Sequence, residues 1–132
     1  MNAWVDANVL LRFITGDPPA LARRARALMK KAEAGQLRLR LSPLVVAETV
    51  WVLDSFYGFQ HPKIRDALSA LITAAGVDAQ ETDVLLGALH TMAEANVDFV
   101  DAYLAETARA RNEPVCSFDT DFKRLGAETL AR

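Results

Sequence analysis

The chain has 132 residues, of which 52% are hydrophobic and 24% are charged, and its formal net charge at pH 7 is −2. This composition is typical of one globular domain and excludes a disordered or membrane-embedded protein. No apolar run approaches the roughly 18 residues of a membrane span, and Asp6 interrupts any N-terminal export signal, so we expect a cytoplasmic protein.

The N-terminal part of the chain predicts short strands that alternate with helices. Leu37 to Leu41 alternates leucine with arginine, which is a strand pattern, and Ser42-Pro43 is a typical helix start. One helical stripe carries Leu21, Ala25, Leu28 and Ala32. In chain order we expect a strand over 3–5, helices over 9–14 and 19–34, a strand over 37–41 and a helix over 42–58.

The C-terminal part continues the alternation. We expect a helix over 62–75, a strand over 77–80, helices over 82–95 and 98–111, a strand over 114–117 and a short helical turn after Asp119. Strands separated by helices predict an α/β fold with a mostly parallel sheet. Because no repeat or linker-like stretch interrupts the pattern, residues 1–132 are expected to form a single domain.

Charge is divided unevenly along the chain. Residues 1–40 hold eight Lys/Arg against three acidic residues, a balance of +5, whereas residues 41–132 hold seven against fourteen, a balance of −7. This asymmetry could place a basic flank beside an acidic centre, or it could reflect an ordinary solvated helix face.

Four acidic residues, Asp6, Glu48, Asp101 and Asp119, each stand between apolar neighbours. An ionised carboxylate near an apolar core needs a compensating partner, because burial alone would favour its protonated form. Converging carboxylates would make a hard-cation site suited to Mg²⁺ or Mn²⁺. The single cysteine, Cys116, excludes both an intramolecular disulfide and a multi-cysteine zinc site.

Each acid also has a structural alternative. Asp6 and Asp119 would follow strands, at the sheet edge where α/β proteins bind ligands, but either could simply cap a helix or a turn. Glu48 shares a helical stripe with Leu44, Trp51 and Val52, where it could also form a buried salt bridge or lie at the margin. Asp101, three residues after Asp98, is close to a capping-box position. The set of four is more informative than any member.

The order of the motifs resembles the PIN-domain family. The segments that carry the resemblance are Asp-Ala-Asn from Asp6, Ser-Pro-Leu-Val-Val-Ala-Glu up to Glu48, Asp-Phe-Val-Asp-Ala around Asp101 and Ser-Phe-Asp-Thr-Asp-Phe around Asp119. The resemblance runs from Val5 to about Leu125, and the compact length is similar to that of VapC-type ribonuclease toxins. It implies a three-layer α/β/α fold with a short, mostly parallel central sheet, a homodimer and a cognate antitoxin.

The resemblance also implies a metal-dependent endoribonuclease. Asp6, Glu48, Asp101 and Asp119 match the family's acidic quartet around Mg²⁺ or Mn²⁺, with Asp121 as a reserve ligand. Our hypothesis is that Asp6, Asp101 and Asp119 hold the metal, and that Glu48 orients or deprotonates the attacking water. The remaining candidates are supporting polar residues and cations that could hold RNA phosphates: Asn8, Ser117, Arg12, Arg23, Arg26 and Lys30.

Other functions remain possible from the sequence. A phosphotransfer domain is disfavoured because Asn8 stands where a second early acid would be needed. A non-catalytic PIN-like module with a structural metal is the more serious alternative. An aromatic-rich segment could belong either to the core or to a dimer or antitoxin interface: Trp51, Phe56, Tyr57 and Phe59.

Overall fold

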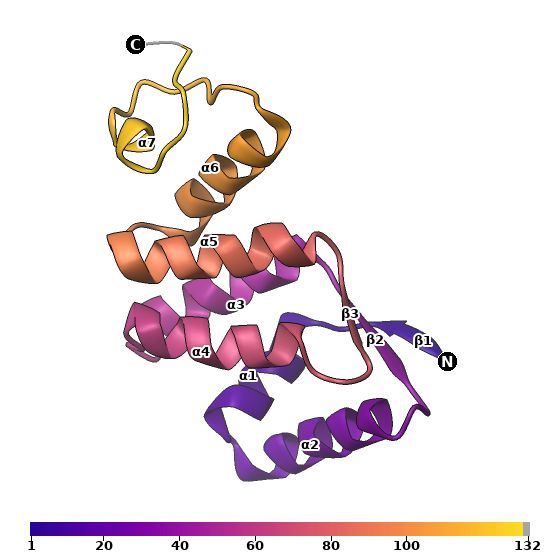
Figure 1. Cartoon of the computed structure of the whole chain (residues 1–132). Helices are drawn as coiled ribbons and strands as arrows, with labels where there is room; N and C mark the ends of the chain where they lie inside the picture. Colours follow the sequence, from indigo (N-terminus) through magenta and orange to yellow (C-terminus); the bar gives the residue numbers. More distant parts are fainter. Residues whose placement is uncertain (131–132) are drawn as a thin grey trace. The chain divides into compact units, whose positions relative to one another are not determined.

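The computed structural model describes residues 1–130 and divides the chain into two compact units, Met1–Gln80 and Glu81–Arg132 (Figure 1). The first unit contains a three-stranded sheet and four helices, and the described residues of the second form helices and connecting segments. Within residues 1–130, no helix has both the length and the apolar character that crossing a membrane requires.

The sheet of the first unit is short and entirely parallel. Its strands lie in the order β1 (Asn2–Trp4), β2 (Arg38–Leu41) and β3 (Val77–Ala79). Leu39 of β2 pairs with Ala3 on one side and with Val77 on the other. The expected alternation is confirmed, because Leu39 and Leu41 are buried while Arg38 is exposed. The predicted parallel α/β arrangement is therefore present.

Four helices surround the strands in the first unit. Ser42 accepts a hydrogen bond from the Leu44 amide at 3.2 Å, and Pro43 follows in the first turn, so the predicted helix start is confirmed. The helices α1 and α2 pack together, α3 contacts both α1 and α4, and α4 contacts β3. Their bounds are α1 Ala7–Thr15, α2 Pro19–Glu33, α3 Pro43–Ser55 and α4 His61–Ile72.

The buried face of helix α2 is not the one expected from its apolar stripe. Ala22, Ala25 and Ala32 are fully buried, whereas Leu21 is 39% exposed and Leu28 is only partly buried. Small side chains let a helix backbone approach its neighbours closely, and the larger leucines then fall at the edge of the contact. The close approach is clearest at Ala32, whose backbone lies against Gly76 just before β3.

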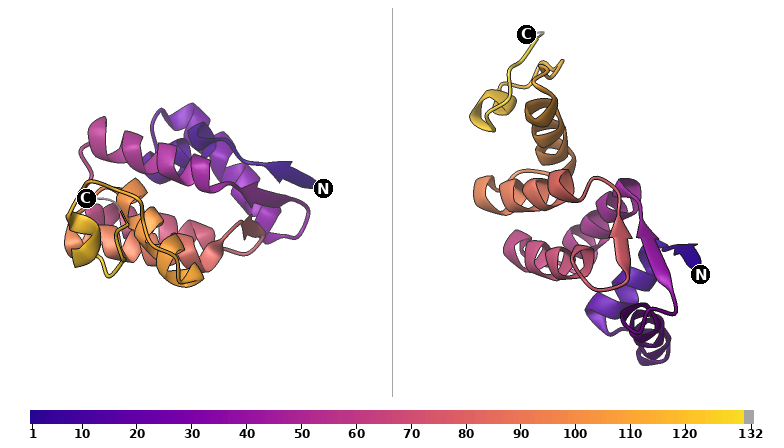
Figure 2. Two further views of the ribbon diagram at one scale, coloured as in Figure 1. Left: turned by 90° about the horizontal axis from the view of Figure 1, so that it is seen from above. Right: turned by 45° about the vertical axis from the view of Figure 1, so that its right-hand side comes forward.

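The second unit is built on the pair α5 (Thr82–Ala95) and α6 (Phe99–Arg111), which pack against each other, as both views in Figure 2 show. The bounds of α5 are those expected from the sequence. A smaller core joins α6 to the short helix α7 (Asp121–Arg124), and its buried members are Ala105, Ala108, Val115, Phe122, Leu125 and Ala127.

The expected strand over residues 114–117 is wrong. Val115 forms only an isolated parallel bridge with Thr129, in which its amide donates to the Glu128 carbonyl at 2.7 Å. Pro114 has no amide hydrogen, so this pairing cannot extend toward the N-terminus as a ladder. The buried side chain of Val115 is held instead by the local core of the second unit.

Candidate metal centre and active site

Asp6 stands between β1 and α1. Its Oδ1 accepts a hydrogen bond from the Ala7 amide at 2.8 Å, and Asp6 is the N-cap residue of α1. The helix-capping role that the sequence allowed for Asp6 is therefore confirmed. Asp6 is nevertheless exposed and follows a parallel strand, at the edge of the sheet where α/β proteins bind ligands.

Glu48 lies on the exposed face of α3, which corrects the expected apolar environment. Its stripe neighbours Leu44 and Trp51 are 82% and 68% exposed, and the buried face of α3 consists of Val46, Thr49, Val50 and Leu53. The alternative of a buried salt bridge is wrong for the same reason. Apolar neighbours on a helix did not imply burial here, because the helix has apolar residues around most of its circumference.

Asp101 occupies the first turn of α6 and is partly buried. Asp98 is the N-cap residue, but its side chain makes no capping hydrogen bond, so a capping box is not formed. Burial is the largest cause of a raised pKa at Asp101, followed by the negative charges of Asp98, Asp119 and Asp121. The second unit therefore gathers four carboxylates within electrostatic reach of one another.

Asp119 lies in the turn that leads into α7, and Asp121 is the first residue of that helix. The Asp119 Oδ1 accepts from the Asp121 amide at 2.8 Å, and the Ser117 hydroxyl accepts from the Asp119 amide at 2.9 Å. Asp119 is thus an exposed residue that caps a turn, which was the alternative to a ligand role in the sequence analysis. It does not follow a strand. Ser117 holds the backbone of this turn.

The four candidate acids fall into two pairs, Asp6 and Glu48 in the first unit and Asp101 and Asp119 in the second. Over the described range 1–130, no three His, Cys, Asp or Glu side chains form a group that could hold a metal ion. The donor chemistry still fits a hard divalent cation. The negative charges of Asp98, Asp119 and Asp121 act on Asp101, a bound cation would relieve this repulsion, and carboxylate oxygens are the ligands that Mg²⁺ prefers.

The raised pKa of Asp101 predicts a pH dependence of stability. Because the folded carboxyl holds its proton more tightly than the unfolded one, its contribution is most favourable at low pH and is lost as the pH rises through the raised pKa. The wild type should therefore lose a small amount of stability as the pH rises, which Asp101→Asn should not lose. The unfolding free energy of Asp101→Asn minus that of the wild type should increase by a few tenths of a kcal/mol between about pH 4 and about pH 7. Urea denaturation without divalent cations measures this difference, and a flat or falling difference would contradict the assignment.

The basic candidates are on α1 and α2. Arg23, Arg26 and Lys30 are exposed on α2, while Arg12 is partly buried and its Nη1 donates to the Tyr57 hydroxyl and the Asp17 carbonyl, each at 3.3 Å. A fifth cation, Arg24, was not singled out from the sequence. It lines a cavity with Arg12, and only the packing of α1 on α2 reveals it.

The aromatic-rich segment at the end of α3 and in the residues that follow it is only partly core. Trp51 and Phe56 are 68% and 78% exposed, so the core interpretation is wrong for these two. Tyr57 is partly buried and packs edge-on against both Phe56 and Phe59, at ring-centroid distances of 5.0 Å and 6.2 Å. The segment therefore presents apolar surface to solvent.

Comparison with known protein families matches the PIN domain over residues 3–128, which spans both units and almost the whole chain. The chain belongs to the PIN-domain family. The match, the parallel three-stranded sheet and the helices confirm the expected three-layer α/β/α class. PIN domains are generally nucleases that use divalent metal ions, and the four candidate acids of this one all lie within the matched residues. A comparison with curated proteins finds no match.

Proposed function

We propose that this PIN domain is a metal-dependent endoribonuclease that hydrolyses RNA phosphodiester bonds, and that it is the VapC-type toxin of a toxin–antitoxin pair. The observation that carries the proposal is the partly buried Asp101, whose pKa is raised by burial and by the negative charges of Asp98, Asp119 and Asp121. A carboxyl whose pKa is raised by burial together with like charges is a candidate for a functional site. The PIN match supplies the class of reaction.

In this proposal residues 1–132 act as a single domain, and Asp6, Asp101 and Asp119 bind Mg²⁺ or Mn²⁺. The bound cation would polarise a phosphate oxygen and lower the pKa of water. Asp121 serves as a further ligand through water. Ser117 fixes the Asp119 turn through its hydroxyl, and Asn8, at the start of α1, is assigned as a supporting polar residue beside Asp6.

Glu48 is assigned to the attacking water. Its exposure on α3 means that its carboxylate is already in contact with solvent and can accept a proton from a water molecule. Binding of the RNA backbone is assigned to Arg12, Arg23, Arg26 and Lys30, whose positive charges complement phosphates.

The proposed partners follow from the exposed apolar surface as well as from the resemblance. Trp51 and Phe56 are large, exposed and close in sequence, and such residues are enriched at the centres of protein interfaces. We assign this surface to a homodimer contact or to the cognate antitoxin, in a cytoplasmic complex. Size measurement of the chain alone and with a co-expressed antitoxin tests the assignment.

Metal removal is the direct test of the proposed reaction. We expect purified protein to fragment single-stranded RNA in Mg²⁺ or Mn²⁺, to lose this activity in excess chelator, and to regain it when either cation is restored. The test measures RNA fragment ends on a sequencing gel. A protein that is stabilised by the cation but leaves RNA intact would instead be the non-catalytic module with a structural metal.

A further inference from the structure

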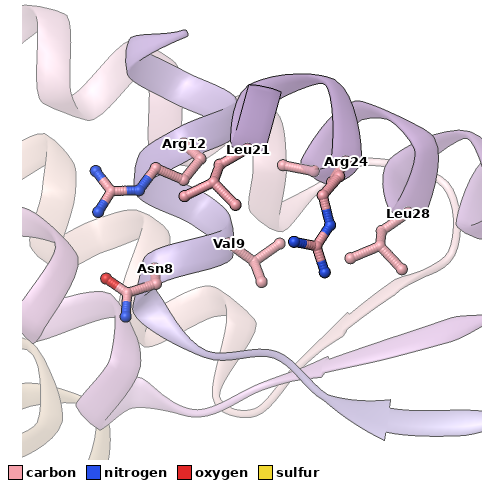
Figure 3. Close-up of a pocket in the computed structure, with 7 residues that line it drawn as sticks. Asn8, Val9, Arg12, Leu21, Arg24 and Leu28 are labelled. Atoms are coloured by element: carbon pink, nitrogen blue, oxygen red, sulfur yellow. The ribbon is translucent and has the colours of Figure 1, made fainter. Parts of the chain in front are cut away.

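A cavity of about 240 Å³ lies between α1 and α2 in the first unit (Figure 3). It is smaller than the roughly 300–1,000 Å³ typical of sites for drug-sized ligands, so it can enclose the base of one nucleotide but not the whole nucleotide. Its wall is apolar and is formed by Val9, Leu21, Ala25 and Leu28.

The polar groups of the cavity are Asn8, Arg12 and Arg24, and no acidic residue lines it. Figure 3 shows the Arg24 side chain reaching between Val9 and Leu28. Arg12 lines the cavity as well, but Figure 3 shows its guanidinium turned away from Arg24, and its Nη1 donates to the Tyr57 hydroxyl and the Asp17 carbonyl. The lining is positively charged, which favours an anionic group beside Arg24.

We propose that this cavity binds one nucleotide of single-stranded RNA next to the cleaved bond, with the phosphate on Arg24 and the base against the apolar wall. The proposal rests on the ribonuclease function above. A guanidinium can bind phosphate through two parallel hydrogen bonds and can also stack on a base. Asn8 connects the cavity to the proposed metal site, because it stands two residues after Asp6 at the start of α1.

This inference singles out Arg24 from the other cations of α2. Arg23, Arg26 and Lys30 are exposed on the same helix but do not line the cavity, so they can attract RNA only through general electrostatics. A matched control is Lys31, which is on the same helix and is not among the cations assigned to the RNA backbone. Arg24 and Lys31 are both exposed and equal in charge, and only Arg24 lines the cavity.

Binding is best measured in an Asp6→Asn background, so that cleavage does not interfere. We expect Arg24→Gln to weaken binding of a fluorescent single-stranded RNA of about 12 nucleotides by about tenfold, and Lys31→Gln by less than about twofold. Arg24→Lys should be intermediate, because it keeps the charge but loses the planar pair of donors. In a plot of the logarithm of the binding constant against the logarithm of the salt concentration, the magnitude of the slope should fall by about 0.7 for Arg24→Gln.

Equal losses for Arg24→Gln and Lys31→Gln, or no loss for Arg24→Gln, would overturn the cavity proposal. So would tighter binding of an acidic peptide than of RNA, which would assign the cavity to a protein partner. In the active enzyme, Arg24→Gln should raise KM and leave kcat nearly unchanged. Failure of the wild type to cleave RNA would contradict the ribonuclease function separately, because the binding comparison uses a variant that does not cleave.

Discussion

Replacing Asp6 with asparagine should lower RNA cleavage at least about 100-fold, the loss typical when one charged or hydrogen-bonding group is removed from a catalytic site. The fold should be unaffected. Asparagine caps helices as well as aspartate does, and its side-chain oxygen can accept the same hydrogen bond from the Ala7 amide. Initial rates of RNA cleavage in Mg²⁺ and urea denaturation of the same preparation measure both effects.

A suitable control for Asp6→Asn is Asp66→Asn, which removes the same charge from an exposed position on α4. Asp66 contacts Arg65 at 3.0 Å and is not among the proposed site residues. Its cleavage rate should match the wild type within about twofold, since surface substitutions usually change stability by less than about 0.5 kcal/mol. Full activity in a metal-supplied Asp6→Asn preparation would refute the assignment of Asp6.

Replacing Gly76 with alanine is expected to destabilise the protein by at least about 3 kcal/mol. Gly76 has φ +81°, a left-handed conformation that alanine adopts poorly, and an added Cβ would lie 2.2 Å from the Ala32 carbonyl oxygen. The backbone must therefore shift. Because the Gly76 carbonyl accepts from the Leu39 amide at 2.8 Å, that shift would also disturb the pairing of β2 with β3. The midpoint of thermal unfolding should fall by about 10 °C.

Gly58→Ala separates the two causes of this loss. Gly58 also has a positive φ, +67°, but no atom of the described residues lies within 4 Å of the position that an added Cβ would take, so only the left-handed conformation is penalised. We expect a cost of about 1–2 kcal/mol for Gly58→Ala. If both variants unfolded at the same temperature, the close contact of Gly76 with Ala32 would not be a determinant of stability.

Local sequence signals were sufficient for most helices and for the sheet. The bounds of α5 were predicted without error, the leucines of β2 alternate as expected, and Ser42-Pro43 begins α3. These features depend on periodicity and on hydrogen bonds between near neighbours in the chain, which the sequence contains directly. The helices α3 and α4 end a few residues earlier than expected, at Ser55 and Ile72.

Packing changed the interpretation of several candidate positions. Glu48 was expected on an apolar, buried face, but α3 has apolar residues on more than one side, and its periodicity did not identify the side that meets the core. Arg24 became a candidate only through the cavity between α1 and α2. Val115 has a strand-like sequence, but its available partner is a single residue, Thr129.

The sequence by itself determined the α/β class, the order of the elements apart from the strand expected over 114–117, and the acidic residues that match the PIN family. Only the tertiary structure decided which face of each helix is covered, that Asp101 is partly buried with a raised pKa, and that Gly76 lies against Ala32. The physical reason is the range of the interactions. Helix and strand formation follow from neighbours in the chain, whereas burial, a raised pKa and a close backbone contact depend on residues distant in the sequence.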